Sequence, residues 1–255
     1  MLYTDFEQIL IEDLTWRKLE ISELILTAKE LNKEVLLKST ILLLYAHWEG
    51  YIKKSSKAYI KYVSERHIKI KDLTANFQAV SIKEFISRCI EHQETLTLAN
   101  ELTFMSKYLK NANKAFSSDI NHENDFDKDI INTESNLKPK VFKNIISILG
   151  MHYKTAISAR EHYLNSHLIA SRNSIGHGSK FETLMLTDFN LTINDVEKLK
   201  DFILTIIDRF KDSLLEYSSK EFFLHANSSL RVTFEDAEEA LIESEFRAIE
   251  ARYST

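Results

Sequence analysis

Residues that break helices are very scarce in this sequence. Its 255 residues include four glycines and one proline, whereas tight β turns, Rossmann motifs and P-loops need several glycines at fixed spacing. Leucine, isoleucine, lysine and glutamate are frequent, and these residues favour helices. Hydrophobic residues make up 44% and charged residues 28%, as in an ordinary globular protein. We therefore expect an all-α fold of long helices.

Hydrophobic residues recur at helical spacing in several stretches. They predict helices over residues 4–31, 34–65, 81–91, 94–112, 139–149, 155–174, 192–224 and 234–251. Asn32 is expected to break or cap the first helix, and Thr192 with Asp195 has the spacing of a capping box. In the fourth stretch the face expected to be buried is formed by Leu98, Leu102, Met105 and Leu109.

The chain shows no linker strong enough to divide it. Residues 116–136 are rich in serine, asparagine and aspartate and are expected to form a polar loop insertion. We predict one helical domain over residues 1–225, containing this insertion, and an acidic helical extension over residues 226–255. The net charge of −5 is concentrated in that extension, so the rest of the chain is nearly neutral.

Cysteine content and hydropathy bear on the cellular setting. The single cysteine, Cys89, excludes an internal disulfide framework and a cysteine-based zinc site. Acidic residues near Met1 are unlike a signal peptide, and the most apolar run, residues 35–48, is too short to span a membrane. We expect a cytoplasmic protein without membrane insertion.

Two of the four glycines flank one histidine, in the segment 171–178, Ser-Arg-Asn-Ser-Ile-Gly-His-Gly. The imidazole of His177 exchanges a proton near neutral pH. The guanidinium of Arg172 pairs with phosphate oxygens and stays charged. These groups suit RNA cleavage, in which a ribose 2′-hydroxyl attacks the adjacent phosphate without a metal ion. Because Arg172 lies about 140° round a helix from His177, the two join one site only if the helix loosens near Gly176 or the site lies at an interface.

Two segments carry a resemblance to a known family. The pattern Arg172-Asn173-x-x-x-His177 resembles the R-x4-6-H motif of the HEPN superfamily of all-α ribonucleases. Residues 43–53, Leu-Leu-Tyr-Ala-His-Trp-Glu-Gly-Tyr-Ile-Lys, are similar to a signature of a bacterial HEPN branch related to the RiboL-PSP-associated HEPN proteins. The likeness extends over about residues 1–225.

The resemblance implies a HEPN-like helical bundle that forms a homodimer, with two motifs facing one composite cleft. It implies a metal-independent endoribonuclease that needs no cofactor, leaves 2′,3′-cyclic phosphate ends, and acts as a toxin or antiviral defence effector beside an antitoxin or defence partner. By position, Arg172 and His177 form the catalytic pair and Asn173 is the adjacent polar residue. Glu49, together with His47, is the candidate for supporting the arginine.

Other interpretations of these residues compete with the first. Arg160 and His167 also match the R-x4-6-H spacing. The histidines between residues 152 and 177 suggest a metal site, but none has HExxH spacing, so we expect no metal. Glu49 could instead pair with Lys53 on the same helix face.

A basic stripe follows the second segment. Lys53, Lys57 and Lys61 recur at intervals of four residues, as on one helix face. The stripe fits a track for the RNA backbone and fits a solvated helix face equally well.

A second function of a different class is a non-catalytic helical module that binds RNA or a partner protein. The sequence does not give the RNA target, the identity of a partner, whether the resting protein is masked, or the role of the acidic helix.

Overall fold

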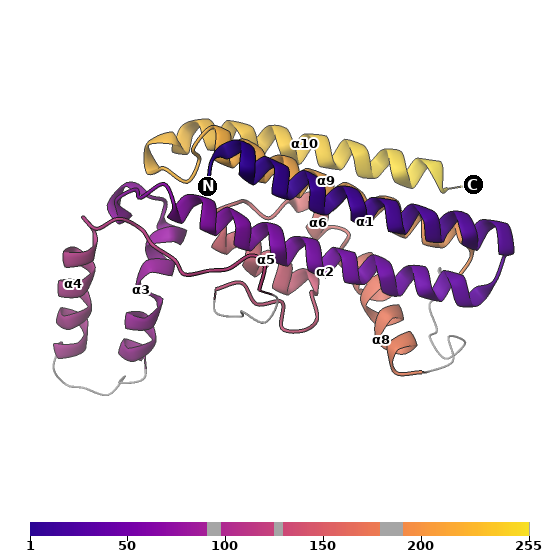
Figure 1. Ribbon diagram of the computed structural model, residues 1–255, viewed down its shortest axis with the longest axis horizontal. Coiled ribbons are helices and arrows are strands. Elements are labelled where there is room, and N and C mark those ends of the chain that lie inside the picture. Colours follow the sequence, from indigo (N-terminus) through magenta and orange to yellow (C-terminus); the bar gives the residue numbers. More distant parts are fainter. Residues whose placement is uncertain (91–97, 125–129, 179–190, 255) are drawn as a thin grey trace.

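The computed structural model describes residues 1–90, 98–124, 130–178 and 191–254, and the regular elements of this part are helices. Four long helices lie alongside one another (Figure 1), with α9 contacting the other three. They are α1 (Tyr3–Leu31), α2 (Glu34–Ser64), α9 (Ile193–Ser219) and α10 (Ser228–Arg252). This arrangement confirms the expected all-α class.

The ends of the long helices follow local sequence signals. Asn32 adopts the left-handed conformation (φ 46°) that ends α1, as an asparagine can at a helix C-terminus. Thr192 and Asp195 form the predicted capping box at the start of α9. The last helix, α10, begins six residues before the expected start. The hydrophobic residues that recur at helical spacing begin only at residue 234, so the first turn gave no signal.

The core is rich in aromatic side chains and centred on α2, which contacts α1, α9 and shorter elements. Most residues between 51 and 63 are buried, whereas Val35 and Leu42 in the apolar first half of the helix are exposed. Side chains without measurable exposure include Phe6, Leu10, Tyr51, Tyr59, Phe77 and Phe116.

Two shorter helices form a hairpin that projects from one end of the bundle (Figure 1), α3 (Ala75–Ile90) and α4 (Ala99–Asn111). The expected burial of the apolar face of α4 is wrong. Its residues are 46–68% exposed, because α4 packs on α3 through another side, where Tyr108 donates to Gln78 Oε1 at 2.7 Å. The exposed set is Leu98, Leu102, Met105 and Leu109.

The polar segment 116–136 is anchored by apolar side chains. In its described residues, 116–124 and 130–136, no helix is present, and Phe116, Ile120 and Ile131 are buried. The next helix, α5 (Pro139–Ile148), has the chain's proline in its first turn, as expected.

The single helix expected over residues 155–174 is divided. It consists of two short helices, a π-helical segment and a final short helix: α6 (Thr155–Ser158), α7 (Glu161–Tyr163), η2 (Leu164–Ile169) and α8 (Ala170–Gly176). The break follows from contacts with α10. Glu239 accepts hydrogen bonds from the backbone N–H groups of Thr155 and Ala156, both at 2.8 Å, and Arg160 leaves the helical conformation to reach α10.

Among the helices that are described, none combines the length and apolar composition needed to cross a membrane.

Candidate active site

The helix α8 carries the Arg172–His177 segment. It lies on the same side of the bundle as the α3–α4 hairpin but at the other end of the molecule (Figure 1). The π-helical segment η2 precedes it directly. Such wider turns are rare and occur often at functional sites. This feature had no signal in the sequence.

The guanidinium of Arg172 is held by two neighbours. Its Cζ atom lies 4.6 Å from the ring centroid of Tyr45 on α2, within the range of a cation–π contact. Its Nη1 donates to Asn173 Oδ1 at 2.8 Å. Arg172 and Asn173 are both half-buried, so the arginine is fixed at the surface with part of its fork open to solvent.

His177 stands at the open end of α8. Its side chain is exposed, and its backbone N–H donates to Asn173 O at 3.0 Å. Gly178 follows with φ +70°, a conformation that favours glycine. Added Cβ atoms at Gly176 and Gly178 would meet nothing within 4 Å, so a ligand could approach the backbone here.

Within one chain α8 does not loosen before His177. The helical turn from Asn173 to His177 is intact, so Arg172 and His177 leave the helix in directions about 140° apart. Arg172 is directed toward α2, and His177 is directed to solvent. The condition that the helix loosens near Gly176 is therefore not met within one chain.

Tyr45 and Glu49 lie one turn apart on the face of α2 that meets α8. Burial raises the pKa of the Tyr45 phenol well above its usual value, the Glu49 carboxylate raises it further, and Arg172 lowers it in part. The Arg172 guanidinium contacts Tyr45 and Asn173, and the Glu49 carboxylate acts on the same tyrosine. The supporting role of Glu49 for the arginine stays a prediction.

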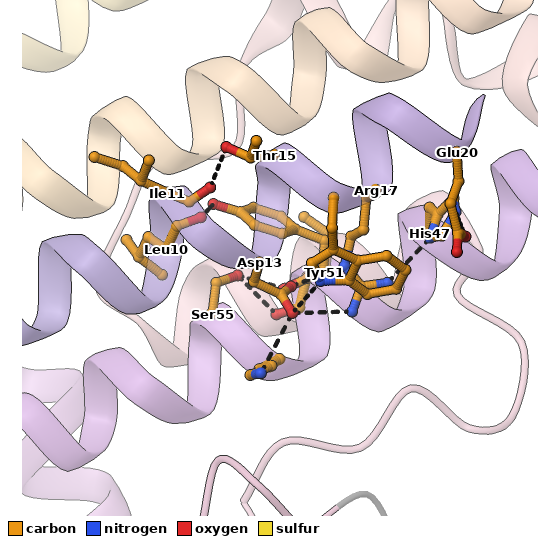
Figure 2. Close-up of polar contacts among 12 residues, drawn as sticks. Leu10, Ile11, Asp13, Thr15, Arg17, Glu20, His47, Tyr51 and Ser55 are labelled. Carbon is orange, nitrogen blue, oxygen red and sulfur yellow. Dashed lines mark hydrogen bonds and ion pairs between the residues drawn. The ribbon is translucent and has the colours of Figure 1, made fainter. Parts of the chain in front are cut away.

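His47 occupies another face of α2, away from Tyr45, and the structure does not bring it to Arg172. It is 3% exposed, and its Nδ1 lies 3.3 Å from Arg17 Nη1 of α1. Its Nε2 lies 3.1 Å from a carboxylate oxygen of Glu20, and the edge of Trp16 packs against its ring. Figure 2 shows His47 beside Arg17 and Glu20 of α1.

The other members of this cluster were not predicted from the sequence. Arg17 Nε donates to Asp13 Oδ2 at 2.8 Å, and both residues are under 10% exposed. Lys54 reaches the same carboxylate at 3.3 Å. A Cβ at Gly50 would lie 2.7 Å from Arg17 Nη1, so this glycine makes room for a charged side chain. The glycine inside an apolar helix was the available signal.

The lysine stripe is interrupted at its centre, which corrects the expectation of one exposed row. Lys57 is 1% exposed and donates to Asn124 O of the polar segment at 2.6 Å. Lys53 and Lys61 are half-buried, and Lys61 Nζ lies 3.9 Å from Glu65. Lys57 therefore anchors the polar segment and does not reach solvent.

The side chains of the alternative pair, Arg160 and His167, are engaged in contacts within the fold. Arg160 donates to Glu243 at 2.7 Å and to Glu250 at 2.8 Å, both on α10. His167 is 2% exposed, with Nδ1 2.8 Å from Tyr163 O. No group of three or more histidine, cysteine, aspartate or glutamate side chains within the described part of the chain could hold a metal ion.

Comparison with protein-family models identifies the family to which the chain belongs. The model of the HEPN_MAE_28990-like HEPN family matches residues 6–223. The chain belongs to this HEPN family. The match confirms the HEPN superfamily and the helical fold that the sequence predicted, and it ends before α10 begins. No curated protein and no solved structure matches the chain.

Proposed function

We propose that this HEPN protein is a metal-independent endoribonuclease that acts in the cytoplasm as a toxin or antiviral defence effector. One observation carries the proposal: a short helix holds a fixed arginine, and an exposed histidine follows at its C-terminal end. HEPN domains are often ribonucleases, which adds weight to this assignment.

The reaction needs one group that transfers a proton and one group that stabilises negative charge. A ribose 2′-hydroxyl attacks the adjacent phosphorus, the bond to the 5′-oxygen breaks, and a 2′,3′-cyclic phosphate remains. His177 would take the proton from the nucleophile or give one to the leaving oxygen. Arg172, oriented by Asn173, would stabilise the negative charge on the phosphate oxygens.

The divergence of Arg172 and His177 within one chain favours a homodimer. Two copies of α8 facing each other would supply the arginine of one chain and the histidine of the other to one phosphate. Sedimentation of the purified protein is expected to give twice the mass of one chain. A partner protein that masks this cleft would act as an antitoxin.

Cleavage of RNA by purified protein in EDTA tests the proposal. We expect products with 2′,3′-cyclic phosphate ends, and loss of cleavage in His177→Ala with the dimer retained. His162→Ala is the matched control, because His162 is also exposed and lies nearby in the chain. Equal cleavage by His177→Ala and the wild type would overturn the site.

A non-catalytic module is the second candidate, because one chain alone does not bring Arg172 and His177 together. It predicts RNA or protein binding without cleavage. Expression of wild type and His177→Ala in a bacterial host distinguishes the two, since only a ribonuclease gives slower growth and degraded RNA that the substitution reverses.

A further inference from the structure

We propose that Tyr45 is a positioning residue that holds the Arg172 guanidinium in the orientation needed to meet an RNA phosphate. This inference rests on the proposed function and assigns a role to a residue outside the Arg172-Asn173-x-x-x-His177 motif. It uses the contact between α2 and α8, which are more than a hundred positions apart in the chain.

The tyrosine ring is a fixed platform. Tyr45 is 3% exposed, its hydroxyl accepts a hydrogen bond from Leu137 N at 2.8 Å, and it donates to Asn136 Oδ1 at 3.3 Å. Both ends of the side chain are thus held, the backbone end by α2 and the hydroxyl by residues 136–137.

The Arg172 guanidinium lies against the ring of Tyr45. The ring of Tyr45 lies 4.6 Å from Cζ and Asn173 Oδ1 accepts from Nη1, so the guanidinium is held at two points while Arg172 stays half-buried. A planar guanidinium held in this way loses little further freedom when it binds a phosphate.

Two other roles for Tyr45 do not fit its surroundings. A ring that is 3% exposed offers no face on which an RNA base could stack. Burial and the Glu49 carboxylate raise the pKa of the phenol, and its hydroxyl is occupied by Asn136 and Leu137, so it does not exchange protons with substrate.

A double-mutant cycle on RNA binding tests this role, with a 2′-O-methyl RNA oligonucleotide as a probe that cannot be cleaved. Tyr45→Leu is expected to weaken binding by about threefold to thirtyfold, the range of a cation–π contact. In an Arg172→Ala background the same change should have no further effect, because Tyr45 acts through the arginine. Equal weakening in both backgrounds, or none in the wild type, would overturn the inference.

Trp48→Phe is the matched control. The Trp48 Nε1 donates to Leu137 O at 3.1 Å, so this variant loosens the same residues 136–137 without touching Arg172. Tyr45→Phe also loses the hydroxyl contacts but keeps the ring. Both variants should bind the probe as the wild type does, and weakening by either as large as that of Tyr45→Leu would contradict the role of the ring.

A second measurement covers the case in which Tyr45→Leu does not fold. Trifluorophenylalanine at position 45 keeps nearly the shape of Tyr45→Phe but removes the negative face of the ring. Binding should weaken by about twofold to fivefold relative to Tyr45→Phe, and unchanged affinity would overturn the inference.

The outcomes separate this inference from the proposed function. If His177→Ala abolishes cleavage and Arg172→Ala weakens binding while Tyr45→Leu does nothing, the ribonuclease stands and the positioning role fails. If Arg172→Ala binds the probe normally, both the phosphate contact and the role of Tyr45 are overturned. If His177→Ala cleaves normally, the proposed function fails on its own test.

Discussion

Arg17 carries a charge into the interface between α1 and α2, where Asp13 and His47 enclose it. Removing one member of a buried ion pair is costly, because the other charge stays buried without its partner. The low exposure of both Arg17 and Asp13 makes this pair a test of how the two helices are joined.

We predict that Arg17→Leu lowers the free energy of unfolding by about 3–5 kcal/mol, because the buried Asp13 carboxylate loses its 2.8 Å partner and keeps the more distant Lys54 at 3.3 Å. Urea denaturation measures this loss. Arg247→Leu is the control: it removes an i,i+4 pair with Glu243 whose arginine is 75% exposed, so it should cost less than about 1 kcal/mol. Equal losses would mean that the Arg17 cluster contributes no more than a surface pair.

His47 predicts a pH dependence of stability. Burial lowers its pKa below 6.5, the neighbouring Arg17 lowers it further, and Glu20 and Asp13 raise it in part. Because the unfolded chain then takes up the proton at higher pH than the folded chain, the free energy of unfolding falls as pH decreases below about 6.5. In His47→Gln the fall between about pH 7 and pH 5 should be smaller. An identical pH profile in thermal unfolding would contradict the assignment.

The sequence identified the segment 43–53 as informative but not how its side chains are divided. At about 100° per residue, Tyr45 and Glu49 share the face toward α8, while His47 and Gly50 face α1. An aspartate and an arginine four residues apart usually form a surface pair, so Asp13 and Arg17 gave no sign of being buried.

The acidic helix α10 has a structural role that its composition did not reveal. Its carboxylates bind the segment 152–160: Glu235 accepts from His152 N and pairs with Lys154, Glu239 binds the first N–H groups of α6, and Arg160 is held by two further glutamates. Negative groups are stabilised at a helix N-terminus.

Glu239→Ala is predicted to destabilise the protein by about 1 kcal/mol, as the loss of a helix cap does. Asp236→Ala is the control, since Asp236 is exposed on the same helix and should change stability by less than about 0.5 kcal/mol. Thermal unfolding of both variants at neutral pH measures the difference. If Asp236→Ala costs as much as Glu239→Ala, the contact with α6 is not the cause.

The long helices could be predicted from the spacing of hydrophobic residues and from helix caps, because those signals are local in the sequence. The division of residues 155–174 did not, because its cause lies on α10, more than seventy residues away in the chain. A periodic pattern also cannot tell which apolar face finds a partner, and so the burial of the α4 face was predicted wrongly.

The exposed apolar face of α4 leads to a prediction for the folded monomer. Replacing Leu102 and Leu109 together by Gln should change the free energy of unfolding by no more than about 1 kcal/mol, because each surface change contributes about 0.5 kcal/mol or less. Leu10→Ala, in the core without measurable exposure, should cost about 2–5 kcal/mol. Urea denaturation at low protein concentration compares them, and a core-sized loss in the α4 variant would show that this face is covered in solution.

The last helix lies beyond the segment that the HEPN family shares, yet it completes the packing of that segment. Its Phe246 ring lies 5.1 Å from Phe202 of α9, and its glutamates neutralise Arg160. A gene truncated after Phe223 would yield a chain in which the hydrophobic surface of α9 around Phe202 is exposed and Arg160 has lost both glutamates. Evolutionary gain or loss of this helix would therefore have required matching changes at Arg160 and along α9.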